Sequence, residues 1–287
     1  MIITRVIGGL GNQMFQYAAG LALANAKQTE LKADLSAFEK GTDAGMTARS
    51  YGLGQFEMPV AAANSNEIQL LRKKSGTKIL RTLQRYFPSL FKSVYFSESG
   101  TDYHPTFFQC PAHTYLEGYW QSEKYFKGIE TAIREAFVFK KHITDPVSHL
   151  SDHITSVNSV SVHVRRGDYL KLQHMYALCS LEYYEKAVQL LSGKVQAPLV
   201  LFVFSDDIDW CKENFKFQAE LHFIQTEDLY KDLFLMTQCR HHIIANSSYS
   251  WWGAWLNAHT DKIVIAPAKW YEQKESPDIY PQNWIKL

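Results

Sequence analysis

The sequence predicts an α/β protein built on parallel sheets of the Rossmann type. Short runs rich in Val, Ile and Leu alternate with stretches whose apolar residues recur at helical spacing. Leu199–Phe204 is a run of six consecutive apolar residues, typical of a central parallel strand covered on both faces. Because strands and helices alternate, we expect right-handed crossovers between neighbouring parallel strands.

Composition limits the classes of function. A chain of 287 residues with 46% hydrophobic and 21% charged residues is an ordinary globular protein of one large or two medium domains. Its formal net charge of +1 makes nucleic acid an improbable partner. The four cysteines are scattered, which predicts reduced thiols rather than disulfides or a zinc site. No stretch suits a signal peptide or a membrane helix, so we expect a soluble, cytoplasmic protein.

The chain opens with the beginning of a βαβ unit. Ile2–Ile7 reads as a strand, Gly8–Gln13 as a glycine-rich turn, and Met14–Ala26 as an alanine-rich helix. The glycines permit close backbone approach to a ligand, and a helix N-terminus favours negative charge. A tight connection that binds nothing is the less favoured alternative for this turn. The amides of Asn12 and Gln13 favour a ligand, because they can donate to a phosphate or a sugar hydroxyl.

The next hundred residues carry less readable chemistry. Leu31–Leu35 reads as a second strand, with Asp34 near its end. Asn66–Phe91 mixes Lys and Arg with Ile and Leu, and is predicted as a basic amphipathic helical region broken near Ser75 and Gly76. Such a region suits either peripheral contact with an anionic membrane or an ordinary solvated helix face, and the second use is commoner.

An aromatic segment precedes the middle of the chain. Tyr115–Trp120 is predicted as a strand, followed by a helix from Glu123. Its aromatic rings could stack on a sugar or form a buried core, which is their commoner use. The polar run Lys140–Asn158, which contains Pro146, is the best linker candidate. We therefore place a first domain at residues 1–155 and a second at 156–287, with the final residues free to pack back on the first.

The central motif is Ser159–Tyr169. Val160, Val162 and Val164 alternate with polar residues, which predicts a short buried strand ending at two adjacent arginines, a glycine and Asp168. A guanidinium group grips phosphate oxygens bidentately, and ligands of open α/β sheets lie beyond the carboxyl ends of the strands. The alternative is a surface turn in which the arginines pair with Asp168.

Further strand and helix patterns continue to the end of the chain. Ser180 can cap a helix, and Ser205-Asp206-Asp207 follows the long apolar strand, as a ribose or sugar ligand or as a helix cap. The remaining predicted elements are helices at 208–215, 228–237 and 251–256, and strands at 221–224, 243–245 and 263–266.

A second anion-binding group is predicted at Asn246-Ser247-Ser248. These residues stand between a strand and a helix, where hydroxyls and free amide groups bind anions. Taken alone, they also fit a simple N-cap. Together with Arg165 at another strand end, they would complete a diphosphate site that needs no metal.

Five motifs, in order along the chain, resemble the α1,2-fucosyltransferases of glycosyltransferase family 11. His163-Val-Arg-Arg-Gly-Asp168 resembles the H-x-R-R-x-D signature shared with α1,6- and protein-O-fucosyltransferases. The others begin at Gly8, Gly118, Phe204 and Asn246. The resemblance implies a GT-B fold, with two Rossmann-like domains facing across a cleft. It also implies GDP-fucose as donor, no cofactor or metal, and inverting transfer to the 2-hydroxyl of a terminal galactose in a glycan acceptor.

The resemblance also implies roles for individual residues. Arg165 would clamp the β-phosphate and stabilise the leaving GDP, while Asp232 would accept hydrogen bonds from guanine. Arg166 would brace the loop, against Asp168 for instance. The full donor-binding prediction is His163, Arg166, Asp232, Asn246, Ser247, Ser248, Gly11, Asn12, Ser205 and Asp206, and the acceptor-binding prediction is Gln13, Tyr119 and Trp120.

The catalytic base is the open position. The related α1,6 enzymes carry a glutamate five residues past the signature aspartate, where this chain has Gln173. The remaining candidates are Asp168, Asp34, Glu117 and His174, and we favour Asp168 because it belongs to the donor loop. Two rival functions remain: a fucosyltransferase of α1,3 or α1,6 linkage, and a non-catalytic GDP-sugar-binding protein. Neither the acceptor nor the oligomeric state can be read from the sequence.

Overall fold

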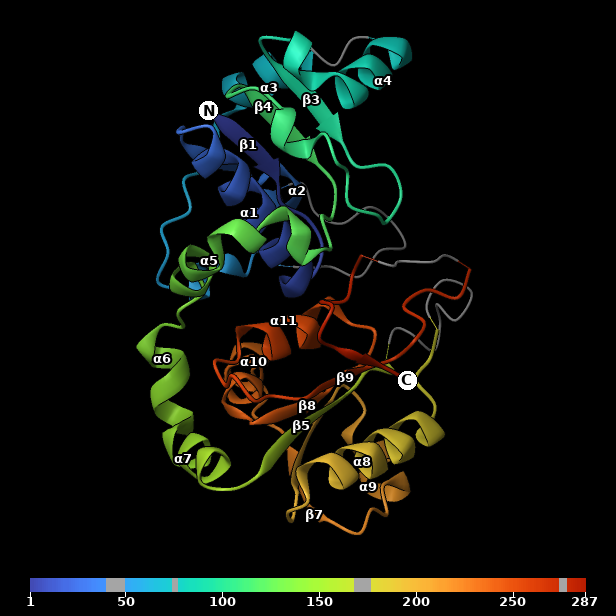
Figure 1. Cartoon of the computed structure of the whole chain (residues 1–287). Helices are drawn as coiled ribbons and strands as arrows, with labels where there is room; N and C mark the ends of the chain where they lie inside the picture. Colours follow the sequence, from blue (N-terminus) through green and yellow to red (C-terminus); the bar gives the residue numbers. More distant parts are fainter. Residues whose placement is uncertain (40–49, 74–76, 168–176, 274–277) are drawn as a thin grey trace. The chain divides into compact units, whose positions relative to one another are not determined.

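The computed structural model describes residues 1–39, 50–73, 77–167, 177–273 and 278–287 (Figure 1). It divides the chain into two compact units, Met1–Val138 with Pro277–Ile279, and Phe139–Ser276 with Tyr280–Leu287. Each unit contains one sheet in which every strand pair is parallel. The predicted α/β class with parallel sheets is therefore confirmed.

The sheet of the first unit has the order β2-β1-β4-β3. Its strands are β1 (Ile2–Arg5), β2 (Leu31–Asp34), β3 (Val94–Ser97) and β4 (Thr114–Glu117). A glycine at position 20 lets α1 lie close to the sheet, because a Cβ there would be 2.8 Å from Leu31 Cδ1 and 3.1 Å from Thr4 Cβ. The helices are α1 (Leu10–Ala26), α2 (Ser36–Glu39), α3 (Ser65–Lys73), α4 (Lys78–Tyr86) and α5 (Glu130–Ala136), with 3-10 turns at Leu53–Gln55, Pro88–Leu90, Phe107–Gln109, Glu123–Tyr125 and Lys127–Ile129.

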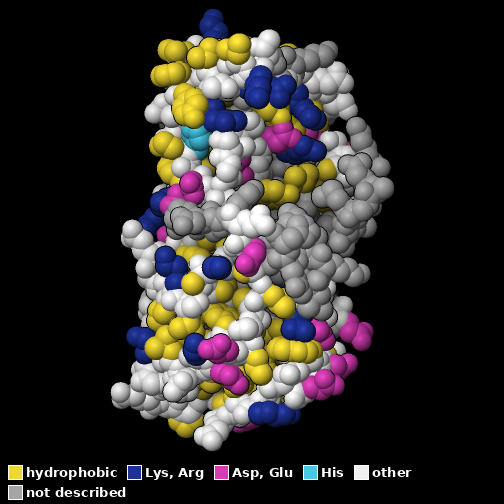
Figure 2. All heavy atoms as spheres, turned by 90° about the vertical axis from the view of Figure 1, so that its right-hand side faces the viewer, with side chains coloured by type: hydrophobic (Ala, Val, Ile, Leu, Met, Phe, Trp, Pro, Cys, Tyr) yellow, Lys and Arg dark blue, Asp and Glu magenta, His cyan; other side chains and the backbone are white. Residues whose placement is uncertain are grey.

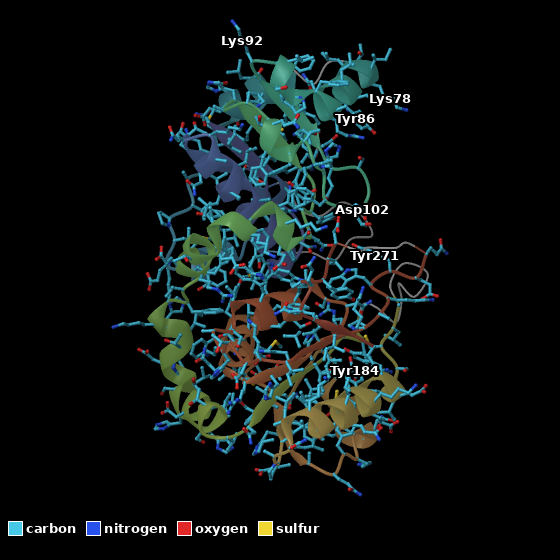
Figure 3. All side chains as sticks on the ribbon, in the orientation of Figure 1. Lys78, Tyr86, Lys92, Asp102, Tyr184 and Tyr271 are labelled. Atoms are coloured by element: carbon cyan, nitrogen blue, oxygen red, sulfur yellow. The ribbon has the colours of Figure 1, made fainter. Side chains whose placement is uncertain are left out.

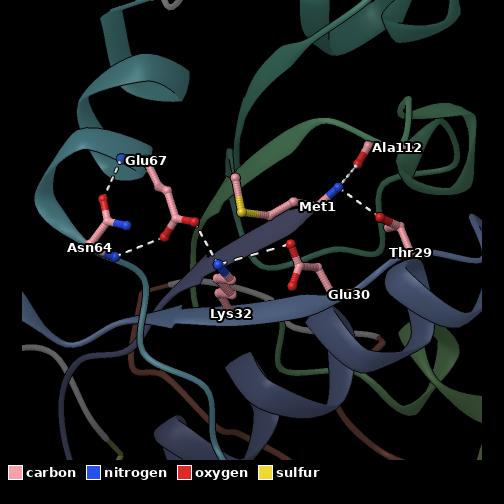
Figure 4. A network of polar contacts seen from close by, with 7 residues as sticks. All are labelled: Met1, Thr29, Glu30, Lys32, Asn64, Glu67 and Ala112. Atoms are coloured by element: carbon pink, nitrogen blue, oxygen red, sulfur yellow. Dashed lines mark hydrogen bonds and ion pairs between the residues drawn. The ribbon is translucent and has the colours of Figure 1, made fainter.

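Polar contacts connect the edge of this sheet to the segments around it (Figure 4). Lys32 on β2 pairs with Glu67 on α3 at 2.5 Å. Glu67 in turn forms a capping box with Asn64, in which each side chain accepts a hydrogen bond from the other residue's backbone N–H at 2.9 to 3.0 Å. The Met1 amino group donates to Thr29 Oγ1 and to the Ala112 carbonyl, both at 2.7 Å. The contacts of Glu67 hold the start of α3 against β2, and those of Met1 join the start of β1 to the segments before β2 and β4.

The second unit contains a six-stranded sheet of order β10-β9-β8-β5-β6-β7. Val160, Val162 and Val164 of β5 face a buried cluster formed with α8 and α9, as their alternation predicts. The strands are β5 (Ser159–Val164), β6 (Val200–Ser205), β7 (Glu220–Ile224), β8 (His241–Ile243), β9 (Val264–Ala266) and β10 (Ile285–Lys286). The helices are α6 (Lys141–Thr144), α7 (Ser148–Ser156), α8 (Leu181–Val195), α9 (Ile208–Asn214), α10 (Leu229–Gln238) and α11 (Ser248–Leu256), with a 3-10 turn at Asp145–Val147.

The predicted linker at residues 140–158 is wrong. The segment forms α6, a 3-10 turn and α7, with Ile154 fully buried in the core of the second unit. Its polar residues cover the solvent side of a packed helix, and Pro146 is accommodated in the first turn of the 3-10 segment. The two compact units consequently divide at Val138 and Phe139, rather than after residue 155. Residues 280–287 belong to the second unit, where β10 pairs with β9, while 277–279 belong to the first.

Two further findings bear on the sequence predictions. All four cysteines are free and buried, as expected for reduced thiols. In the part of the chain that the structure describes, no helix is long and apolar enough to cross a membrane.

Candidate nucleotide-binding and transfer site

The predicted donor residues of the second unit meet at the carboxyl edge of its sheet. Arg165 and Arg166 follow β5, Asp206 follows β6, and Ser247 precedes α11 after β8. The strand order β8-β5-β6 makes these three strands direct neighbours. The fold therefore brings together side chains that lie about 40 to 80 residues apart in sequence.

Asp206 holds the arginine loop. Its Oδ2 pairs with Arg165 Nη1 at 3.0 Å, and its Oδ1 accepts from the Arg166 backbone N–H at 2.9 Å. Gly167 lies against the same carboxylate, since a Cβ at Gly167 would be 2.6 Å from Asp206 Oδ2. The Asp206 carboxylate therefore orients the guanidinium of Arg165 at the strand end. Its predicted contact with ribose or sugar stays a prediction.

Arg166 is held on the other side of this loop. Its Nε pairs with Asp207 Oδ2 at 3.2 Å, and its guanidinium lies 3.9 Å from the ring centroid of Trp210. Asp207 also caps α9 by accepting from the Trp210 N–H, and the Ser205 hydroxyl accepts from the Asp207 N–H at 2.9 Å. The bracing role predicted for Arg166 thus has partners in Asp207 and Trp210. Asp168, the partner suggested by sequence, lies outside the described residues.

His163 is a neutral, buried side chain beside the arginine. Burial, and next the positive charge of Arg165, lower the pKa of His163 to about 3. Its ring lies 5.6 Å from the ring of Tyr249, and its Nδ1 atom has no hydrogen-bond partner among the described residues. Tyr184, labelled in Figure 3, donates from its hydroxyl to the His163 carbonyl at 3.1 Å. The hydroxyl of Tyr184 on α8 therefore fixes the end of β5. Within the described part of the chain, the Nδ1 atom of His163 is left without a partner.

The start of α11 lies in the same group of residues. Ser247 is the N-cap of this nine-residue helix, yet its hydroxyl makes no capping hydrogen bond. Tyr249, in the first turn, contacts His163. Burial, and next the charges of Asp232 and Asp228, raise the pKa of Tyr249, while Arg165 acts in the opposite direction. The contact between Tyr249 and His163 thus brings the serine-bearing helix start to the strand end that carries Arg165, as a shared phosphate site requires.

Asn246 serves the fold instead of presenting its amide at this edge. Its Nδ2 donates to the carbonyls of Ala177 and Trp270 at 2.6 and 2.8 Å, and its Oδ1 accepts from the Cys179 thiol. The side chain is 1% exposed. Because both amide hydrogens are used within the protein, the prediction that Asn246 binds the donor through its amide is corrected to a structural role.

Asp232 lies on α10, where its Oδ1 accepts from Thr226 Oγ1 at 2.7 Å. Burial raises the pKa of Asp232 to about 6, although the hydrogen bonds from Thr226 oppose the shift. The charge of Asp228 contributes to the raised pKa of Asp232, and the charge of Asp232 contributes to the raised pKa of Tyr249. Asp232 is thus a desolvated acceptor whose charge acts on Tyr249, in the first turn of the serine-bearing helix.

The glycine-rich turn of the first unit is shaped as expected. Gly9 is the N-cap of α1, and Gly8 has φ +79, a conformation that favours glycine. Gly11 is buried within α1. Asn12 remains partly exposed, and its Oδ1 accepts from Gln121 Nε2 at 2.8 Å. Asn12 therefore stays at the surface of this turn, where a ligand can reach it.

Gln13 is not available to an acceptor. Its Nε2 donates to the carbonyls of Gly8 and Ser50, and its Oε1 accepts from the Gly52 N–H, at 2.8 to 2.9 Å. The residue is 1% exposed. A buried amide whose groups are all paired connects the turn to the segment at 50–52, so the acceptor-binding prediction is wrong for Gln13.

The aromatic segment divides between surface and core. Tyr119 is exposed, whereas Trp120 is fully buried with φ +56 and packs on Phe96 and Phe107. Trp120 is therefore a core residue, and its predicted contact with an acceptor sugar is wrong. Tyr119 retains the exposure that such a contact needs.

A carboxylate that the sequence interpretation missed supports this turn. Glu98, directly after β3, accepts from the Tyr119 N–H at 2.6 Å and from the Trp120 N–H at 3.0 Å. Burial raises the pKa of Glu98 to about 7 despite these two hydrogen bonds. No sequence motif marks Glu98, and only the approach of β3 to β4 reveals its role. Because both oxygens hold the turn, we describe it as a positioning residue.

Two of the four candidates for the catalytic base form hydrogen bonds or an ion pair within the protein. Asp34 is fully buried and accepts from the Tyr115 hydroxyl at 2.6 Å and the Ser36 N–H at 3.0 Å. Burial would raise the pKa of Asp34, but these hydrogen bonds outweigh it and the pKa is lowered. Glu117 pairs with Arg5 at the carboxyl edge of the first sheet. The other two candidates, Asp168 and His174, lie outside the described residues.

A group with metal-ligand spacing lies elsewhere. Among the described residues, only His153, Glu220 and His222 place three ligand atoms within 4.8 Å of one another. Glu220 begins β7 and His153 is near the end of α7, before β5, so the group is at the amino edge of the sheet. It is therefore at the opposite edge from Arg165.

The chain is similar in sequence to proteins of one glycosyltransferase family. The model of the glycosyl transferase family 11 matches residues 55–287. An alpha-1,2-colitosyltransferase of Escherichia coli is 35% identical and covers 100% of this chain and 99% of its own. The O-antigen biosynthesis glycosyltransferase WbnK of Escherichia coli is 32% identical over 98% of each chain. The human galactoside alpha-(1,2)-fucosyltransferase 1 is 28% identical over 53% of this chain and 45% of its own.

Solved structures share the fold at low identity. POFUT1 in complex with GDP-fucose aligns with a TM-score of 0.51, 13% identity, and coverage of 92% of this chain and 97% of that one. NodZ alpha-1,6-fucosyltransferase co-crystallized with GDP aligns with a TM-score of 0.51, 14% identity, and coverage of 88% and 90%. From the family match over most of its length and from relatives that align along all of it, the chain belongs to glycosyl transferase family 11.

Proposed function

We propose that the protein transfers L-fucose from GDP-fucose to the 2-hydroxyl of a terminal galactose in a glycan, with inversion and without a metal. The observation that carries the proposal is the meeting of Arg165, the first turn of α11 and Asp232 at one sheet edge. This group offers a cation for phosphate, neutral donors beside it, and a desolvated acceptor for a base. The donor bound to POFUT1, and the names of the family relatives, support the same substrate class.

Several residues of the second unit would bind and stabilise the leaving diphosphate. Arg165 would neutralise the charge that grows on the β-phosphate as the bond to fucose breaks, and Asp206 keeps its guanidinium oriented until then. The first-turn N–H groups of α11 and the hydroxyls of Ser247 and Ser248 would donate to phosphate oxygens. Neutral His163 would offer a ring nitrogen to the nucleotide without adding charge.

Asp232 would select guanine. An ionised carboxylate accepts from N1–H and from the exocyclic amine, a pair of donors that adenine, cytosine and uracil do not present together. Thr226 holds one of its oxygens at 2.7 Å, which fixes the direction of the other. The acceptor proton would go to Asp168, which is kept as the proposed base because Asp34 and Glu117 have internal partners.

A GT-B arrangement, with two Rossmann-like domains facing across a cleft, is part of the proposal. It is supported by the division into two units with parallel sheets and by the fold of POFUT1 and NodZ. Asn12 would then approach the donor, and Tyr119 the acceptor, from the first unit.

A second donor is favoured by one specific observation. The 35% identical relative of full coverage is named as a colitosyltransferase. Colitose differs from fucose by the absence of one ring hydroxyl, so the same diphosphate and guanine contacts would serve both sugars. The donor choice would then depend only on contacts to that hydroxyl.

The test is a competition assay with the purified chain. GDP-fucose and GDP-colitose are supplied with a galactose-terminated oligosaccharide, kcat/KM is measured for each donor, and the product linkage is determined by NMR. We expect fucose transfer with an α1,2 linkage. An α1,3 or α1,6 product would overturn the proposed linkage. A higher kcat/KM for GDP-colitose would make GDP-colitose the donor in place of GDP-fucose. Binding of a GDP-sugar without transfer to any acceptor would show a non-catalytic binding protein.

A further inference from the structure

Helix α4 presents its apolar face to solvent. Ile79, Leu83 and Tyr86 follow the i, i+4, i+7 spacing of one helix face, and Phe87 and Leu90 continue it beyond the helix end. Such a stripe normally packs against a core. Here Ile79 is 75% exposed and Leu90 77% exposed, and the others are close to half exposed or more.

The opposite side of α4 makes the contacts with the first unit. Gln84 is buried, Arg85 donates to the Ser97 hydroxyl at 3.2 Å, and Arg81 lies 5.7 Å from the ring centroid of Tyr95. Polar side chains thus hold the helix to β3 while the apolar ones face outward. Ten large hydrophobic side chains are exposed in the described part of the chain, and six of them lie between Leu70 and Leu90. A concentration of this kind marks an interaction site.

The same segment carries an unbalanced positive charge. Residues 68–97 contain seven Lys and Arg and no Asp or Glu, whereas the remaining 23 basic residues of the chain stand against 29 acidic ones. Lys78 and Lys92 extend outward from the ribbon in Figure 3. Figure 2 shows dark blue basic side chains next to yellow hydrophobic ones at the upper end of the molecule. The apolar stripe therefore lies in a basic surrounding, although the chain as a whole is nearly neutral.

We propose that this surface, formed by Ile79, Leu83, Tyr86, Phe87 and Leu90 with Lys78 and Lys92 beside them, docks the protein on an anionic phospholipid bilayer. A helix with apolar residues on one face and Lys and Arg beside them lies in the interface plane, with its apolar side chains among the acyl chains and its cations at the lipid phosphates. A second copy of the chain is a poorer occupant, because a symmetric contact would bring two basic segments, each with Lys78 and Lys92 exposed, against each other.

The inference goes beyond the proposed transfer reaction. Its test needs neither donor nor acceptor, so failure of one proposal leaves the other standing. Membrane docking adds a partner to the enzyme and predicts that glycans carried on lipid are favoured over free oligosaccharides, because the bound enzyme and such acceptors share one surface.

The experiment is flotation of the full-length chain with vesicles. We expect binding to phosphatidylcholine vesicles that contain phosphatidylglycerol, much weaker binding to phosphatidylcholine alone, and release by added salt. The double variant Ile79→Ser with Leu90→Ser should bind at least about tenfold more weakly, because each side chain loses its burial in the bilayer. The matched control is Val138→Ser, an exposed apolar residue outside this surface, which should bind like the unchanged protein.

A charge variant tests the same surface independently of its apolar residues. Lys78→Gln with Lys92→Gln should weaken binding to the anionic vesicles, whereas Lys186→Gln with Lys212→Gln on the second unit should not. Circular dichroism verifies that each variant is folded. The proposal is overturned by absence of vesicle binding, by equal binding to neutral vesicles, or by equal losses in the control variants. Sedimentation equilibrium tests the alternative occupant. If the protein does not bind vesicles but self-associates, and the Ile79→Ser, Leu90→Ser variant does not self-associate, the surface is a contact with a second copy.

Discussion

At the scale of single residues, the site depends on charged groups whose positions are set before any ligand arrives. Arg165 and Arg166 are adjacent in sequence, yet Asp206 orients the first and Asp207 with Trp210 holds the second. A preorganised guanidinium avoids the cost of reorienting when charge develops on a leaving phosphate. The two arginines therefore differ in expected effect, although their chemistry is the same.

Replacing Arg165 by alanine should lower kcat/KM for transfer by at least about a hundredfold, because the growing phosphate charge loses its cation. Arg165→Lys should retain only part of the unchanged protein's kcat/KM, since an ammonium group cannot bind a phosphate bidentately. The measurement is the initial rate of GDP release coupled to product formation. Arg240→Ala, at an exposed pair with Asp261, serves as the control and should leave kcat/KM unchanged. An unchanged rate in Arg165→Ala would exclude it from the reaction.

The pKa of Asp232 makes GDP binding sensitive to pH. Since its folded pKa is raised to about 6, its own contribution to stability is present at acid pH and is lost as the pH rises through 6. Guanine binding requires the ionised carboxylate, so GDP affinity rises with pH whereas the contribution of Asp232 to folding stability falls. We expect GDP affinity to be constant above about pH 7 and to fall below pH 6, approaching tenfold per pH unit.

Calorimetric titration of GDP between pH 5 and 8 measures this effect. Asp232→Asn should bind GDP more weakly at pH 8 and lose the pH dependence, because no carboxyl group titrates. Retention of the same pH profile in Asp232→Asn would show that another group is responsible and would remove Asp232 from guanine recognition.

At the scale of elements, the site depends on how closely helices approach each other. A Cβ at Gly253 of α11 would lie 3.0 Å from Met236 Cβ and 3.2 Å from its sulfur on α10. The absence of a side chain therefore lets the two helices carrying Ser247 and Asp232 pack together. The sequence contains the glycine, but only the packing explains it.

Gly253→Val should destabilise the second unit by roughly 1 to 3 kcal/mol, because the added carbons force α10 and α11 apart. Urea unfolding monitored by tryptophan fluorescence measures the change, and GDP affinity should fall with it. Gly193→Ala is the matched control, as nothing lies within 4 Å of a Cβ there, and it should be neutral or stabilising. Equal effects of the two substitutions would contradict the close-packing explanation.

The elements themselves were predicted well where periodicity is strong. The strand at 200–205 and the helix that Ser180 caps follow directly from apolar spacing and capping chemistry. The linker at 140–158 was wrong because polar residues on the exposed side of α7 look the same in sequence as a solvated connection. No strand is predicted at β3, because Val94, Tyr95 and Phe96 are three apolar residues in a row without alternation.

At the scale of the whole molecule, the arginine loop at the carboxyl edge of the second sheet has carboxylate partners within the chain. Asp206 and Asp207 pair with the two arginines, and the group with metal-ligand spacing that the described residues contain is at the opposite edge of the sheet. Transfer should therefore persist in the presence of EDTA, because cationic and neutral donors of the chain replace a metal at the diphosphate. The check is the transfer rate with and without chelator. Loss of activity that Mg²⁺ or Mn²⁺ restores would contradict metal independence.

By itself, the sequence determined the parallel α/β class, the position of the arginine loop at a strand end, and the family resemblance, because these depend on local periodicity and on short motifs. Only the tertiary structure decided how each polar group is used. Gln13 and Asn246 look like ligand-binding amides in sequence, but carbonyls distant along the chain take their hydrogens. The apolar stripe of α4 likewise has the spacing of a core helix and faces solvent. Spacing fixes which side chains share a face, whereas the direction of that face depends on what packs against it.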